Sequence, residues 1–275
     1  MTKFYELAYE STLFEVNLPY KPGLVDPLDN GSHDDMDVST FIASSNALLS
    51  HFKVYDTIGR TASLDAMFSL LRQQGQLAES DMFLATNKIN THKGLNFMMA
   101  IVIAACSYCE QHNLQFSELQ SVIKVITKDI LSDFEKLNLN ERLSHGEKLF
   151  IDQNIKGIRY EAYTGFDLVF NKLLPLCQTI KSETVYYLIL LTCMSELEDT
   201  TILHRSKQPG LDYVKQYSKD VLNHITLYPD TLVSQLLAMN DDFKKRNISP
   251  GGSADYLALT HFLYHAQSHF DKKTR

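Results

Sequence analysis

Acidic and imidazole side chains gather in the irregular segment 21–37, whose sequence is KPGLVDPLDNGSHDDMD. Asp34, Asp35 and Asp37 fall just before an apolar helical pattern. One interpretation is helix capping, because carboxylates satisfy the free amides of a first helical turn. The alternative is a divalent metal site or acid–base catalysis that includes His33, because like charges this close cost free energy unless a cation or a proton offsets them.

A second polar cluster, TNKINTHKG at residues 86–94, opens directly into an apolar stretch. Lys88, Asn90, His92 and Lys93 precede the amides of the expected helix, an arrangement suited to holding phosphate groups. The GxxxxGK[ST] pattern of a P-loop is absent, and a polar turn with solvated lysines is the other interpretation.

Two further clusters combine acids with cations. Arg159 and Glu161 fall between glycines, which predicts a turn, and a surface ion pair would also explain them. Glu198 and Asp199 end an apolar helical pattern, where the helix dipole favours cations. Acids at that position indicate a bound metal or a cationic partner, and Arg205 can be that partner.

The segment 247–255, NISPGGSAD, joins a glycine pair to a helix start. Its exposed amides suit an anion or a flat ring. Ser253 is alternatively an ordinary N-cap. The candidate binding residues of this segment are Ser249, Gly251, Gly252, Ser253 and Asp255.

Other patterns carry less chemistry. Cys106 and Cys109 have C-x-x-C spacing without a second pair, and His261, His265 and His269 share a helix face without the glutamate of an HExxH motif. No G-x-S-x-G elbow, dinucleotide fingerprint or RNA-binding aromatic motif occurs.

The elements that position these clusters are predicted to be helices. Apolar residues recur at i, i+3, i+4 and i+7 over 41–52 and 119–134, and alternating strand patterns are scarce. We expect further helices near 4–16, 63–78, 94–112, 144–156, 165–180, 183–197, 211–225, 230–246 and 253–270. The prediction is an all-α, single-domain bundle over 1–275, with the polar loops lining one cleft.

Composition limits the class of protein. The 275 residues carry a formal charge of −7, which disfavours sequence-independent binding to nucleic acid. Four cysteines in apolar surroundings predict reduced thiols, and with no export signal this suggests a cytoplasmic protein. The longest apolar stretches, 97–106 and 185–194, are about half the roughly 20 residues that a membrane span needs.

In this order, the clusters resemble the triphosphoribosyl-dephospho-coenzyme-A synthase family, which serves citrate lyase and has a relative that serves malonate decarboxylase. The resemblance covers nearly the whole chain. One departure is EDTT at 198–201, where the family pattern is closer to DDTN. The matching strings are KPGLVD, NGSHDDMD, NTHKG, RYEA, DT followed by LHR, and NISPGGSAD.

The resemblance implies that the 2'-hydroxyl of 3'-dephospho-CoA attacks C1' of ATP and that adenine leaves, with Mg²⁺ required. The product would be the precursor of the prosthetic group that a separate transferase attaches to the acyl carrier protein of the lyase. Candidate catalytic groups are His33, Asp34, Asp35, Asp37 and Asp199, and the carboxylates among them, with Glu198, are the candidate metal ligands. The candidate substrate ligands are Lys21, Lys88, Asn90, His92, Lys93, Arg159, Glu161, His204, Arg205 and the residues of 249–255 named above.

Two alternatives remain open at this stage. A Mg²⁺-dependent helical hydrolase of nucleotide or ADP-ribosyl bonds would use the same acids with water as the nucleophile. A helical module that binds ATP without turnover would need no base at all. The sequence leaves the oligomeric state and the choice between citrate lyase and malonate decarboxylase open.

Overall fold

A computed structural model describes residues 2–132, 148–151, 154–155 and 157–273. The described residues form helices and connecting loops without a strand, which confirms the all-α prediction. The elements are α1 (Phe4–Asn17), α2 (Val38–Thr61), α3 (Leu64–Ala85), α4 (Lys93–Gln111), η1 (Phe116–Glu118), α5 (Leu119–Ile126), α7 (Gly157–Tyr163), η3 (Val169–Leu173), α8 (Leu174–Thr179), α9 (Thr184–Glu196), α10 (Thr200–Leu227), η4 (Pro229–Thr231), α11 (Leu232–Arg246) and α12 (Gly251–Lys273).

Helix α4 is the centre of the main core. Its residues 98–107 are all buried, as the continuous apolar stretch predicts, and it contacts α1, α2, α3, α5 and α12. A second apolar cluster joins α9 to α10 and α11, and Leu24 and Ile248 from the polar loops belong to it. Leu24 and Ile248 therefore anchor two of the candidate loops, those before α2 and before α12, in this core.

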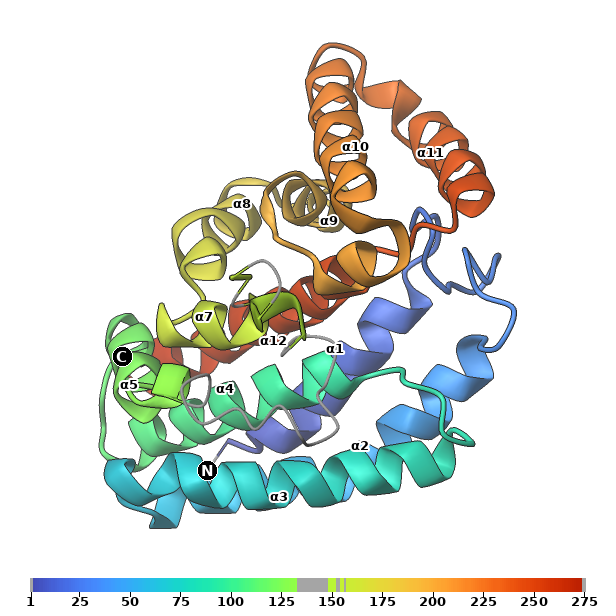
Figure 1. The fold of residues 1–275 in the computed structure, drawn as a ribbon. Helices are drawn as coiled ribbons and strands as arrows, with labels where there is room; N and C mark the ends of the chain where they lie inside the picture. Colours follow the sequence, from blue (N-terminus) through green and yellow to red (C-terminus); the bar gives the residue numbers. More distant parts are fainter. Residues whose placement is uncertain (1, 133–147, 152–153, 156, 274–275) are drawn as a thin grey trace.

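Helices α10 and α11 extend together away from the other helices (Figure 1). The expected helix over 211–225 is the outer part of α10, which is interrupted at Lys207 (φ 61°, ψ −170°). Pro209 follows at once, and because proline lacks an amide hydrogen it favours a new helical start at this point. The inner part of α10 carries Asp199 at its N-cap, together with His204 and Arg205.

Four expected elements differ from the structure. The helix expected near 63–78 continues as α3 to Ala85. The pattern over 119–134 predicts one helix, but α5 ends at Ile126, where the Thr127 hydroxyl donates to the carbonyls of Ile123 and Ala162. The expected turn around Arg159 is the helix α7, which Gly157 and Gly165 bracket with φ values of 52° and 74°. The helix expected over 165–180 begins as the π-helix η3, because Pro175 cannot donate the amide bond of a regular turn. Most of the expected helix 144–156 lies outside the described residues.

None of the described helices combines the length and the apolarity that crossing a membrane requires. All four cysteines are buried and free. Among the described residues, no group of three histidine, cysteine or acidic side chains is arranged to hold a metal ion.

Candidate active site

One large cavity, of about 2140 Å³, opens where the polar loops and the N-termini of α4, α7, α10 and α12 meet. Most of the candidate residues line it, although they lie far apart in the sequence. The candidate residues on its wall are His33, Asp35, Lys88, Asn90, His92, Lys93, Arg159, Glu161, Glu198, Asp199, His204, Arg205, Ser249, Gly251, Gly252 and Asp255.

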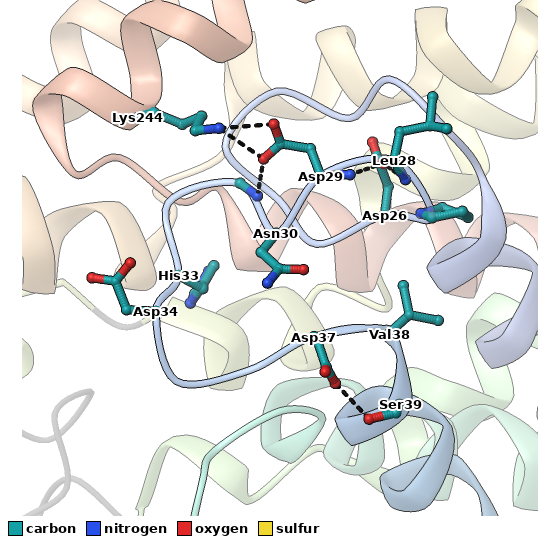
Figure 2. A pocket seen from close by; sticks show the side chains of 12 residues that line it. Asp26, Leu28, Asp29, Asn30, His33, Asp34, Asp37, Val38, Ser39 and Lys244 are labelled. Carbon is teal, nitrogen blue, oxygen red and sulfur yellow. Dashed lines mark hydrogen bonds and ion pairs between the residues drawn. The ribbon is translucent and has the colours of Figure 1, made fainter.

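A smaller pocket of about 630 Å³ lies beside it, within the segment 26–39 (Figure 2). Asp34 and Asp37 line this pocket, and His33 borders both pockets. Lys244 of α11 closes one side through an ion pair with Asp29, whose carboxylate it contacts at 2.8 Å. Apart from Lys244, the lining of this pocket comes from the single segment 26–39, whereas the larger cavity is lined by residues of many elements.

Asp199 joins the starts of two helices. It is buried, and as the N-cap of α10 its carboxylate accepts from the amides of Thr201 (2.9 Å) and Ile202 (3.4 Å). The other oxygen accepts from the amide of Ser253 in α12 at 3.0 Å. Burial raises the pKa of Asp199, and these amide bonds oppose that rise. Asp199 is therefore a helix cap, and it also lies on the cavity wall, where it can contact a substrate.

Arg205 holds two polar loops against each other. Its guanidinium donates to the Ser32 carbonyl in the first loop, and to the Asn247 carbonyl (3.2 Å) and side-chain oxygen in the loop before α12. Asn247 ends α11 in the left-handed conformation (φ 54°), which presents these oxygens. Partial burial lowers the pKa of Arg205.

His33 lies between Arg205 and Ser249. Its Nε2 is 2.8 Å from the Ser249 hydroxyl, and its Nδ1 is 3.3 Å from Arg205 and 3.8 Å from Asp35. Burial and then the Arg205 charge lower the pKa of His33, which the Asp35 charge partly offsets. The imidazole is therefore neutral near pH 7, where it can exchange a hydrogen bond with a substrate.

The acids of the first loop do not gather around a common point. Asp37 is the N-cap of α2 and forms a capping box with Thr40. Hydrogen bonds from the Ser39 hydroxyl and from Thr40 lower the pKa of Asp37 to about 2. Asp34 and Asp35 are exposed. The capping interpretation thus accounts for the position of Asp37, and the preformed cluster of metal ligands is not present among the described residues.

Lys21 is not on the cavity wall. Its ammonium group is buried and bonds to the side chain and the carbonyl of Glu15, in α1. The expectation that it contacts phosphate directly is therefore not met by its position, because a lysine beside a carboxylate in the interior is already neutralised. Ser253 is also absent from the wall, because it lies inside the first turn of α12. Lys93 is on the wall, where its ammonium group pairs with Glu79 of α3.

His92 ends a short chain of polar groups. The Thr91 hydroxyl contacts the Ser44 hydroxyl, which lies 2.8 Å from His92 Nδ1. The other ring nitrogen, Nε2, is buried and has no hydrogen-bond partner among the residues that the structure describes. Burial, helped by the Lys21 charge, lowers the pKa of His92 to about 3.

Several residues of the wall had not been identified from the sequence. Glu15 carries no local motif, and its role depends on burial beside Lys21. Arg72, Gln76 and Glu79 lie at a spacing of three to four residues and place one polar stripe of α3 on the cavity. That spacing in the sequence indicates that the three side chains share one face of a helix. Tyr256, whose hydroxyl donates to Glu161 at 2.8 Å, is a further member.

The family model described as "ATP:dephospho-CoA triphosphoribosyl transferase" matches residues 1–274. A Streptococcus equi subsp. equi protein named "Probable 2-(5''-triphosphoribosyl)-3'-dephosphocoenzyme-A synthase" is 38% identical, with 94% of each chain covered. A Streptococcus pyogenes serotype M18 protein of the same name is 36% identical, with 96% of each chain covered. No solved structure matches. The chain belongs to the ATP:dephospho-CoA triphosphoribosyl transferase family.

Proposed function

We propose that this chain transfers the 5-triphosphoribosyl group of ATP to the 2'-hydroxyl of 3'-dephospho-CoA and releases adenine. The observation that carries the proposal is the size and lining of the cavity. Pockets for one small ligand have volumes of about 300–1,000 Å³. The cavity of about 2140 Å³ leaves room for two nucleotides at once, as a direct transfer between them requires.

Cationic and amide groups on the wall suit the phosphates of the two substrates. Arg159 lies on α7, Arg205 on α10 and Lys88 on the loop before α4, so they approach the cavity from different sides. Charge offset matters here because the whole chain is acidic. At about 4 Å an unfavourable charge pair costs roughly 4 kcal/mol at an effective dielectric constant of 20.

Mg²⁺ would offset the remaining charge of the triphosphate. Mg²⁺ typically uses one or two carboxylates and completes its coordination with substrate phosphates and water. Asp34 and Asp35, which are exposed at the mouth of the two pockets, fit that pattern, and Glu198 is a further candidate. Asp37 and Asp199 fit it less well, because their oxygens already accept bonds from helix amides.

The remaining chemistry takes place at C1' of the ATP ribose. Positive charge develops on the ribose as the bond to adenine breaks, and nearby carboxylates stabilise it. The cavity provides Glu161 of α7 and Asp199, the N-cap of α10. Burial raises the pKa of Glu161, although the Tyr256 hydroxyl donates to it. The fixed positions of both groups reduce the reorganisation that the transition state needs.

The product would be the precursor of the prosthetic group of the citrate lyase acyl carrier protein, attached by a separate transferase. The malonate decarboxylase counterpart remains the alternative destination. We place this activity in the cytoplasm, which is supported by the four free thiols. An oligomer is compatible with this assignment.

The test is adenine release from ATP and Mg²⁺, with and without 3'-dephospho-CoA. Release that depends on the coenzyme, with a nucleotide product heavier by one triphosphoribosyl group, supports the transferase. Release without the coenzyme would support a hydrolase. Binding of ATP with no release in either condition would support a binding module.

A further inference from the structure

The carboxylates that line the cavity differ in whether they have partners. Glu15 is bonded to the ammonium group of Lys21, and Glu161 accepts from the Tyr256 hydroxyl at 2.8 Å. Asp199 accepts from three backbone amides. These groups are held in place by bonds that a proton acceptor would have to give up.

The carboxylates nearer the rim are paired with cations or with an imidazole. Each of these carboxylates has a neighbouring nitrogen within 4 Å that a substrate would have to displace or share. The pairs are Glu79 with Lys93, Glu198 with Lys215, and Asp35 with His33.

Asp255 is different. Among the cavity carboxylates that the structure describes, it is the one with neither a hydrogen-bond nor an ion-pair partner. It lies in the first turns of α12, over Gly94 at the start of α4. Burial raises the pKa of Asp255 well above its usual range, and the charges of Glu15 and Asp199 raise it further.

An unbonded carboxylate in such a place costs free energy that a substrate hydroxyl can recover by donating to it. A carboxylate that faces like charges and lacks donors also accepts a proton more readily than it would in water. Gly94 and Gly252 also line the cavity here, and the missing side chain of Gly94 leaves the space that the Asp255 carboxylate occupies.

We propose that Asp255 is the general base that takes the proton from the 2'-hydroxyl of 3'-dephospho-CoA. This inference rests on the proposed function. The 2'-hydroxyl of 3'-dephospho-CoA gives its proton to the Asp255 carboxylate while the hydroxyl oxygen forms the bond to C1' of ATP. The bond from C1' to N9 breaks, adenine leaves with its electron pair and takes a proton from water, and Asp255 returns its proton to water after release.

The direct test is Asp255→Asn, which keeps the size of the side chain and removes its basicity. We expect kcat to fall by about 100-fold or more, while the Kd values for Mg²⁺-ATP and for 3'-dephospho-CoA, measured by calorimetry, change less than about threefold. The matched control is Asp167→Asn, an exposed aspartate that pairs with Lys124 outside the cavity, and it should keep full activity.

A second variant separates base catalysis from structural support. Asp255→Ala leaves a space that formate can enter, and formate should restore at least about tenfold of the lost rate. A merely structural role would not respond to formate. The inference is overturned if Asp255→Asn keeps a kcat within a few fold of the wild type, or if Asp255→Ala is as slow with formate as without it. Wild-type protein without coenzyme-dependent adenine release would overturn the proposed function as well.

Discussion

The Asp255 carboxylate packs directly over Gly94, so that a side chain at residue 94 would collide with Oδ2 of Asp255. The α4 and α12 helices therefore meet inside the cavity at a position where only a glycine leaves the carboxylate in place. This contact connects the first turn of α4 with the start of α12, in two of the segments that carry the family resemblance.

Gly94→Ala should slow catalysis by turning the Asp255 carboxylate away from its position. We expect kcat to fall by about tenfold to 100-fold with little change in thermal stability, because a short side chain can rotate without disturbing the backbone. A double-mutant cycle with Asp255→Asn checks the route of the effect. If Gly94→Ala acts through Asp255, adding it to Asp255→Asn should cost little more, and full additivity of the two losses contradicts this explanation.

Asp199 should prove important for stability. Asp199→Ala removes the cap of α10 and leaves the Ser253 amide without its partner, which predicts a loss of about 1–3 kcal/mol in the free energy of unfolding. Asp199→Asn keeps one accepting oxygen but turns an NH2 group toward the amides that bond to the other oxygen, so it should lose some stability but less than Asp199→Ala. Urea unfolding of both variants provides the measurement. Equal stability of Asp199→Ala and the wild type would contradict the bonds described above.

Arg205→Lys should weaken substrate binding. A lysine cannot bond to Ser32 and Asn247 together, because it lacks the planar fork of a guanidinium. We expect the KM for ATP to rise about tenfold. Arg246→Lys on α11 is the control, because Arg246 stacks on Tyr213 and bonds to Asp242, away from the cavity. The same KM for Arg205→Lys and the wild type would count against this assignment.

We expect the buried His92 to make the folded protein less stable in acid. Its pKa is about 3 in the folded protein and near 6.5 without burial, so between these values the unfolded chain binds the extra proton. Stability contributed by the neutral ring is complete above about pH 6.5 and falls as pH is lowered, by up to about 1.4 kcal/mol per pH unit. Urea unfolding at several pH values should show a smaller slope for His92→Gln than for the wild type. His224→Gln, on the outer part of α10, should keep the wild-type slope, and a His92→Gln slope equal to it would refute the prediction.

Mg²⁺ should bind only together with nucleotide. The described residues contain no group of three ligands, and so Mg²⁺ alone should give no measurable heat in calorimetry at micromolar protein. A chelator should abolish adenine release, and Asp35→Asn should raise the Mg²⁺ concentration needed for half-maximal ATP binding. Tight binding of Mg²⁺ in the absence of ATP would contradict this model of the site.

The helices were predictable where one face is apolar throughout. The stretch at 97–106 identifies α4 because it is apolar on all sides, whereas α2 and α11 are recognised by one apolar face. The helix α7 was missed because glycines usually mark turns, and nothing local shows that Gly157 and Gly165 border a helix. The early end of α5 depends on the Thr127 hydroxyl reaching Ala162, a contact that is distant in sequence.

The sequence predicted which loops form the site, but it did not predict what each side chain in those loops does. The order of the clusters identified most of the cavity wall, including Asp199, Arg205 and Asp255. Whether an acid caps a helix, pairs with a cation or stays unbonded is decided by tertiary packing. Asp37 and Asp255 have the same side chain, yet Asp37 caps α2 at an exposed position and Asp255 lies over Gly94 with no hydrogen-bond or ion-pair partner in the described part of the chain.

The most direct test of the central claim is the reaction run in water enriched in oxygen-18, followed by intact-mass measurement of the products. The transfer proposed here predicts a triphosphoribosyl adduct of 3'-dephospho-CoA without the heavy isotope, and no adduct from the 2'-deoxy coenzyme. Ribose triphosphate carrying oxygen-18, with no adduct, would show that water is the nucleophile and would contradict the account.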